Sequence, residues 1–189
     1  MTLLYQIVFE YWQVLGFKRS PLATPNSPLM LGIGILLALL AAGMKYYFNG
    51  FIGTMHFSLG VFCLALVFEF VLMAMYIRAV LWMHQAQDNF LAFMTCWVMM
   101  MFFLDTIMIF TMGCSMGLQA LGLIQYSSVS FMMIATIIGL VLSLWQIIYV
   151  VYLFKSFIKC PIWQGMVFYL GWLLINYLYI LLLINIVGE

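Results

Sequence analysis

Five long apolar stretches constrain what this chain can fold into more than any other feature. A helix needs about 20 apolar residues to cross the roughly 30 Å of hydrocarbon in a bilayer. The five stretches predict transmembrane helices at about 29–48, 55–82, 90–112, 127–154 and 163–187. The sequence therefore predicts an all-α fold, an integral membrane bundle of five transmembrane helices.

Composition supports this interpretation and excludes one class of partner. Hydrophobic residues make up 68% of the 189 positions and charged residues only 6%, whereas a soluble domain carries about 25% charged residues. Water cannot solvate such a surface, so lipid must be the solvent. The net charge of +1 leaves no basic surface that could bind nucleic acid.

No pattern typical of enzyme or metal chemistry is found in the sequence. The four cysteines show no CxxC spacing, which argues against a zinc site or a disulfide framework. The chain contains no P-loop, no HExxH and no nucleophile elbow. We therefore predict a non-enzymatic protein that binds no metal and no cofactor.

The N-terminal segment differs from the spans that follow it. In residues 2–17, polar side chains recur at helical spacing opposite an apolar side, which favours an amphipathic helix lying in the membrane interface. The basic pair Lys18-Arg19 comes next, and three prolines then form a stiff elbow. We predict two parts: the interfacial helix and elbow at 1–28, and the five-span bundle at 29–189.

Two stripes of small residues are candidate helix-packing surfaces. Small side chains repeated every four residues allow another helix to approach closely in a membrane. We expect at least one stripe to form a helix–helix contact, either within the bundle or with a partner. The stripes comprise Gly34, Ala38 and Ala42 in the first span, and Ala135, Gly139 and Ser143 in the fourth.

Three polar side chains within the spans share one estimated depth, and a fourth lies close to it. A charged side chain at the bilayer centre costs about 2.5–3.5 kcal/mol, so it usually has a partner or a task. At about 1.5 Å of rise per residue, Glu69, Asp105 and Asn176 each lie about 20 Å from the ends of their spans. Lys45 lies slightly further out. We expect both acids to face the bundle interior, with at least one protonated or paired with Lys45.

This polar layer has two interpretations. In the first, the two carboxylates share a proton or ligate an ion, and the layer is a proton or cation site. In the second, the layer is structural: the acids are protonated and bonded to Asn176 or backbone, or an ion pair forms with Lys45. A transporter should also show broken helices or a polar water path, and only glycines and a few hydroxyls favour one here.

The basic residues predict the orientation of the chain. Lys45 is alone near one membrane side, whereas the other side holds Lys18, Arg19, Arg78, Lys155 and Lys159. Basic residues collect on the cytoplasmic side, so we predict a cytoplasmic N-terminus and a C-terminus on the opposite side.

Two short segments, one at the start of the chain and one in its last third, carry a resemblance to a known family. They comprise Phe17-Lys18-Arg19-Ser20-Pro21, Pro25-Asn26-Ser27-Pro28, Trp145 to Tyr152, Lys155 with Lys159, and Pro161 with Gly165. With these residues the chain resembles small proteobacterial inner-membrane proteins that are in turn similar to the Yip1-type five-span membrane proteins. The family's boundary after the fourth span is usually more basic than the two lysines found here. The resemblance implies a five-span bundle in the bacterial inner membrane with a non-enzymatic role, and no site residues.

Two functional hypotheses follow from these patterns. The first is a subunit or scaffold of a larger membrane complex, assembled through small-residue helix faces with other membrane proteins or with itself as a homo-oligomer. Very short loops and the near absence of hydrophilic mass favour it. The alternative is a small proton- or cation-coupled transporter or ion pathway that uses Glu69 and Asp105.

Overall fold

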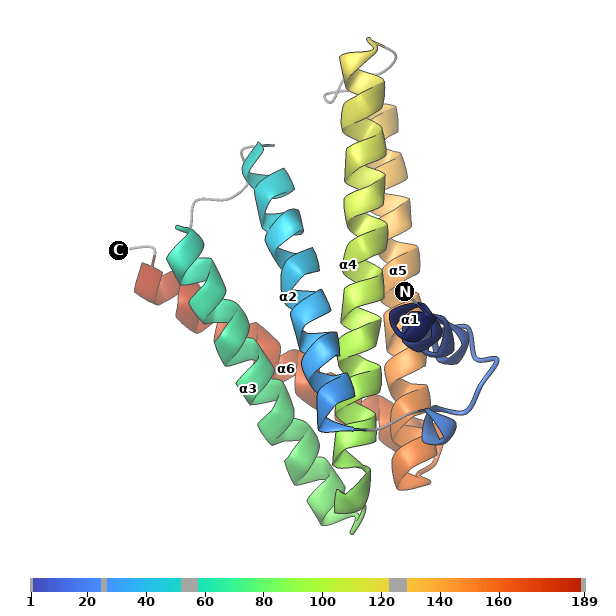
Figure 1. Cartoon of the computed structure of the whole chain (residues 1–189). Helices are drawn as coiled ribbons and strands as arrows, with labels where there is room; N and C mark the ends of the chain where they lie inside the picture. Colours follow the sequence, from blue (N-terminus) through green and yellow to red (C-terminus); the bar gives the residue numbers. More distant parts are fainter. Residues whose placement is uncertain (1, 25–26, 52–57, 123–128, 188–189) are drawn as a thin grey trace.

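The computed structural model describes residues 2–24, 27–51, 58–122 and 129–187, and these form helices and their connections (Figure 1). The all-α prediction is confirmed, with five helices long and apolar enough to cross a membrane. In chain order the elements are α1 (Thr2–Leu15), the 3₁₀ turn η1 (Pro21–Ala23), α2 (Pro28–Phe51), α3 (Leu59–Met83), the 3₁₀ turn η2 (Gln87–Asn89), α4 (Phe90–Ala120), α5 (Val129–Ile158) and α6 (Ile162–Val187).

The structure corrects several predicted helix ends. α4 continues to Ala120 rather than ending near 112, and Gly113 and Gly117 lie within it. A glycine costs a helix about 1 kcal/mol relative to alanine, whereas each unsatisfied backbone group in lipid costs several kcal/mol. The helix therefore continues through both glycines. For the same reason α2 runs on to Phe51 instead of ending near 48.

The remaining ends differ by a few residues. α1 ends at Leu15 rather than 17, and α5 continues to Ile158 rather than ending near 154. The predicted starts at 55 and 127 lie outside the described residues.

α4 is the central helix of the bundle. α2 packs along it, α5 lies beside it, and α6 packs mainly against α5 (Figure 1). In its most apolar stretch, half of the residues of α4 are buried. In the corresponding stretches of α3 and α6, only 11% of the residues are buried. We call the end where α3 finishes and α4 begins the basal end; it is at the bottom of Figure 1, and from it the helices diverge.

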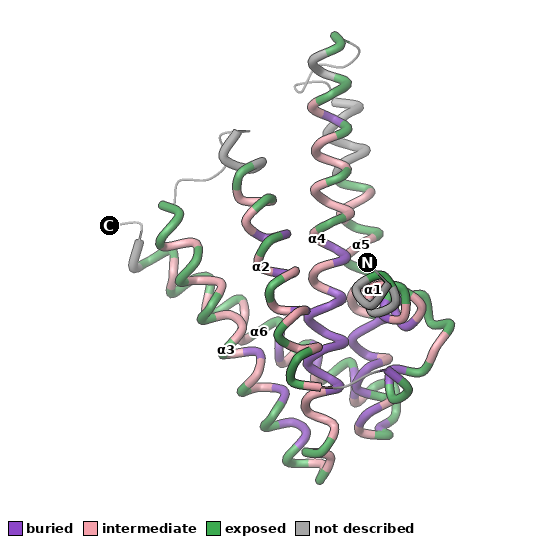
Figure 2. The backbone as a smooth tube through the Cα atoms, in the orientation of Figure 1, coloured by how far each residue is buried: buried purple, intermediate pink, exposed green. Residues whose placement is uncertain are grey.

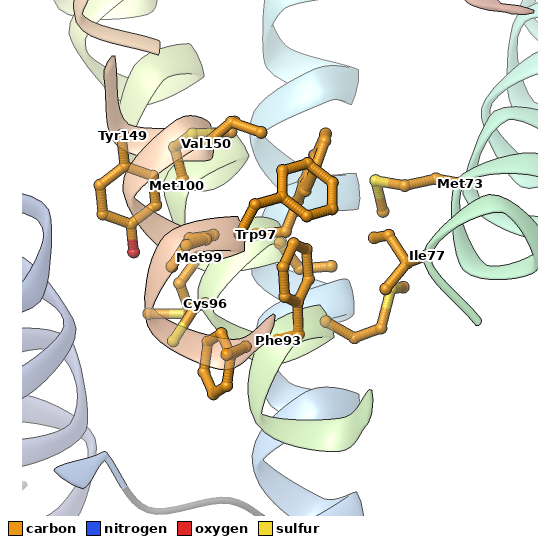
Figure 3. Close-up of a cluster of buried hydrophobic side chains, with 14 of the residues drawn as sticks. Met73, Ile77, Phe93, Cys96, Trp97, Met99, Met100, Tyr149 and Val150 are labelled. Atoms are coloured by element: carbon orange, nitrogen blue, oxygen red, sulfur yellow. The ribbon is translucent and has the colours of Figure 1, made fainter. Parts of the chain in front are cut away.

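The hydrophobic core lies toward the basal end, where the buried positions of α4, α5 and α3 gather (Figure 2). Aromatic rings dominate it: Phe93 and Phe154 lie 4.9 Å apart, and Trp97 meets Trp172 edge-on at 6.0 Å. Figure 3 shows Trp97 between the side chains of α4, α5 and α3. Such aromatic pairs contribute about 0.5–1.5 kcal/mol each beyond the area they bury.

α1 crosses the bundle instead of joining it as a span. In Figure 1 it is viewed end-on, while α4 and α5 run along the page. Its residues Tyr11, Val14 and Leu15 are buried, and Trp12 contacts Phe103 of α4 at 5.3 Å. α1 therefore uses one face to hold the outside of α4, across the direction of the spans and level with Phe103, about 20 Å from the start of α4.

Candidate functional site: a polar layer between the helices

An ion pair joins α2 to α4 within the spans. Lys45 Nζ donates to Asp105 Oδ1 at 2.8 Å. The aspartate side chain is 17% exposed and the lysine side chain 39% exposed. A charge-assisted bond of this length is among the stronger hydrogen bonds in proteins. Asp105 thus has a counterion that compensates its charge.

The first small-residue stripe brings these two helices together. Gly34, Ala38 and Ala42 are all buried on the face of α2 that packs on α4. A side chain added at Gly34 would meet Val98 and Met99 of α4, each at 3.5 Å from the new Cβ. Close approach of the two backbones lets Lys45 reach Asp105 from the neighbouring helix.

A second polar contact joins α3 to α6. Asn176 Nδ2 donates to Glu69 Oε1 at 3.2 Å. Nearby, the Tyr179 hydroxyl donates to the backbone oxygen of Ala65 at 2.8 Å. Glu69 therefore has a neutral amide as its hydrogen-bond partner, whereas Asp105 has a cation.

The two acids line one small cavity between α2, α3 and α4. Its volume is about 30 Å³, and Ala38, Ala42 and Met73 form part of its wall. A water molecule occupies about 30 Å³ in the liquid, and a cavity needs at least about 10–15 Å³ to hold one. The cavity thus has room for one water or one small ion between the carboxyl groups. If both acids are ionised, Lys45 neutralises one charge and leaves a net charge of −1.

On its other side the ion pair borders an open groove, which we call the α4 groove. Its volume is about 250 Å³, several times that of a water molecule. It is open at one side of the bundle and combines charged, polar and apolar side chains. The groove is lined by Lys45, Met101, Leu104, Asp105, Met108, Gly139, Leu142, Ser143 and Gln146.

The second small-residue stripe lies on this groove and makes no close contact within the described bundle. A Cβ added at Gly139 would have no neighbour within 4 Å among the described residues. Ser143 is exposed and donates to the backbone oxygen of Gly139 at 2.8 Å, inside its own helix. The side chain of Ala135 lies outside the described residues. Packing of this stripe against the chain's own helices is therefore not seen here.

Gln146 is a groove residue that the sequence reasoning missed. Its amide lines the α4 groove and forms no hydrogen bond with the described residues. The sequence feature that could have identified it is its position: a polar side chain in the middle of the fourth apolar stretch, one helical turn from Ser143. Within the described part of the chain, no group of three or more His, Cys, Asp or Glu residues could hold a metal ion.

Comparison of the chain with models of protein families, with curated proteins and with solved structures gives no match. The class of the protein therefore rests on its helices. Five helices of sufficient length and apolarity make the chain a multi-pass membrane protein.

Proposed function

We propose that the protein is a non-enzymatic subunit or scaffold of a larger assembly in the bacterial inner membrane, and that its α4 groove receives a transmembrane helix of a partner chain. The observation that supports this most is the set of polar groups around an open groove in mid-span. Ser143 and Gln146 lie in the central part of the candidate span Thr136–Ile158. Ionisable side chains within spans almost always face a protein interior or a water-filled cavity, and serine and glutamine side chains form hydrogen bonds between transmembrane helices.

The lining of the groove indicates the chemistry of the partner helix. Gly139 leaves space at the surface, so a small residue opposite it would allow the two backbones to approach closely. The Gln146 amide, which has no hydrogen-bond partner among the described residues, favours a hydroxyl or carboxamide on the partner. Because Lys45 and Asp105 neutralise each other, the partner helix needs no charge.

The expected loss of partner binding can be estimated from the measured strength of hydrogen bonds between transmembrane helices. Hydrogen bonds between transmembrane helices contribute about 0.6 kcal/mol on average and up to about 1.7 kcal/mol. Replacing Gln146 by leucine should therefore weaken partner binding by about threefold to twentyfold at 1.4 kcal/mol per factor of ten.

Substitution of Gly139 tests the proposal. Gly139→Leu should fill the groove and remove the partner from protein purified in a mild detergent. Gly113→Leu is the matched control, since Gly113 also has open space beside it but does not line the groove. Co-expression of two copies with different affinity tags distinguishes self-association from binding of another chain. If the protein associates with itself, purification through one tag also recovers the copy that carries the other tag. A protein that purifies alone, or a partner that both variants retain, would overturn the proposal.

The orientation and the family belong to the same proposal. A cytoplasmic N-terminus would place the basal end, with Arg78 and Lys155, on the cytoplasmic side. The five-span, non-enzymatic role implied by the resemblance to Yip1-type proteins agrees with a subunit function and adds no site residues.

A second candidate function is a proton or cation pathway, supported by the shared cavity of Glu69 and Asp105. Of the two acids, Glu69 is the one that forms no ion pair with the described residues, so it is the group that would bind a proton or a cation. Glu69→Gln should then abolish proton- or cation-coupled flux in proteoliposomes while the protein stays folded. Glu10→Gln in α1 is the control. If the wild type carries no flux, the layer is structural, and Glu69→Gln should retain assembly.

A further inference from the structure

A second open pocket lies at the basal end, where α3 finishes and α4 begins. Its volume is about 740 Å³. Most of its wall is apolar, and a cation, an indole and an amide complete it. The pocket is lined by Met75, Arg78, Ala79, Leu81, Trp82, Gln87 and Phe90. It is separate from the polar layer, with which it shares no lining residue.

Arg78 is the charged group of this pocket. Its side chain is exposed, and it forms no ion pair or hydrogen bond with the described residues. The nearest acid in sequence on the connection, Asp88, is exposed and does not line the pocket. An arginine guanidinium presents several N–H donors in a planar fork that matches a phosphate. The pocket therefore offers a positive charge that the described part of the chain leaves uncompensated.

The depth of the pocket matches that of lipid headgroups. Arg78 lies about 8 Å from the end of α3, at about 1.5 Å of rise per residue. Trp82 is 68% exposed on the same helix, and tryptophan is enriched at the level of the headgroups. Exposed Met75 lies one turn deeper in the span and can contact an acyl chain. The order along α3 is thus apolar, then cationic, then indole, as in a phospholipid binding site.

We infer that this pocket binds an anionic phospholipid, with the phosphate on Arg78, the acyl chain along Met75 and Ala79, and Trp82 and Gln87 beside the headgroup. The start of α4 adds partial positive charge on the same side, which the neighbouring Asp88 offsets in part. A zwitterionic phospholipid carries its own cation beside the phosphate and would gain less from Arg78.

Native mass spectrometry of the full chain with added lipid tests this inference. The wild type should retain phosphatidylglycerol about tenfold more strongly than phosphatidylcholine, and Arg78→Gln should remove the preference. Lys155→Gln, an exposed cation at the basal end that does not line the pocket, is the control and should leave it unchanged. In the wild type, the preference for phosphatidylglycerol should be weaker at about 1 M salt than at low salt, because salt screens the charge of Arg78.

Four results would overturn the inference, and the first three concern the lipid preference itself. They are equal retention of both lipids by the wild type, a preference that persists in Arg78→Gln, and an equal loss in Lys155→Gln. Displacement of phosphatidylglycerol by millimolar glycerol phosphate would show that a soluble phosphate, and not a lipid, is the ligand. Arg78→Lys keeps the charge and should keep part of the preference, which controls for misfolding of Arg78→Gln.

Discussion

Removing Lys45 should destabilise the fold more than removing Asp105, although the two residues form one ion pair. Lys45→Met leaves the Asp105 carboxylate, only 17% exposed, without a counterion. Keeping a charged group in mid-membrane costs about 2.5–3.5 kcal/mol. We therefore expect a loss of about 3 kcal/mol in the free energy of unfolding.

Asp105→Asn leaves a lysine that has another way to reach water. Lys45 lies about 9 Å from the end of α2 at Phe51, at about 1.5 Å per residue. Its long side chain can extend toward the membrane surface, so we expect a loss of only about 1 kcal/mol, close to that of an ordinary hydrogen bond.

The double variant Lys45→Met with Asp105→Asn completes the cycle. It removes both charges at once, and replacing a buried pair costs less than breaking it. The double variant should therefore be more stable than Lys45→Met alone, with a coupling energy of about 2–3 kcal/mol, within the range for residues in direct contact. The free energy of unfolding can be measured by raising the fraction of SDS in mixed micelles and following tryptophan fluorescence, because Trp97 and Trp172 are buried in the core. A coupling energy near zero, or single variants of equal stability, would refute the reasoning.

Three further predictions concern packing, reactivity and topology. Gly34→Leu should lower stability by about 1–3 kcal/mol because α4 leaves it no room, whereas Gly32→Leu, at an exposed glycine with open space, should change it little; equal losses would contradict the α2–α4 contact. Burial raises the pKa of the Cys160 thiol, so a smaller fraction of it is thiolate at neutral pH. Maleimide should therefore label Cys160 slowly in the folded protein at pH 7 and faster as the pH rises. Cys160 in protein unfolded in SDS is the comparison, and equal labelling rates of the folded and unfolded protein at pH 7 would contradict this. A reporter enzyme fused after Glu189 should be active in the periplasm, and cytoplasmic activity would mean that the predicted orientation is wrong.

The sequence alone was sufficient for the five helices but not for their neighbours. Apolar length determines how many helices can span a bilayer, and the constant rise per residue places polar groups at comparable depths. Hydropathy does not say which helices touch. Asp105 pairs with Lys45 because α2, and not the sequence neighbour α3, packs along α4. Glu69 finds its partner on α6, at Asn176.

Other features could not be predicted because they depend on three-dimensional context. The glycine-rich stretch after Met112 has the composition of a connection, yet backbone hydrogen bonding in lipid keeps α4 helical through Gly113 and Gly117. The two small-residue stripes have the same spacing, but among the described residues only the stripe at Gly34 packs closely on another helix. The divergence of the helices away from the basal end leaves the stripe at Gly139 on an open groove.

Cross-linking in intact membranes tests the central claim, a partner helix in the α4 groove, most directly. A photoreactive amino acid is placed at Ser143, which lines the groove, and in a second variant at Val141, which is 59% exposed on α5 and does not line it. We expect position 143 to cross-link to a single transmembrane segment of another subunit or of a second copy, identified by mass spectrometry, while position 141 yields lipid adducts. Lipid adducts alone at both positions would contradict this claim.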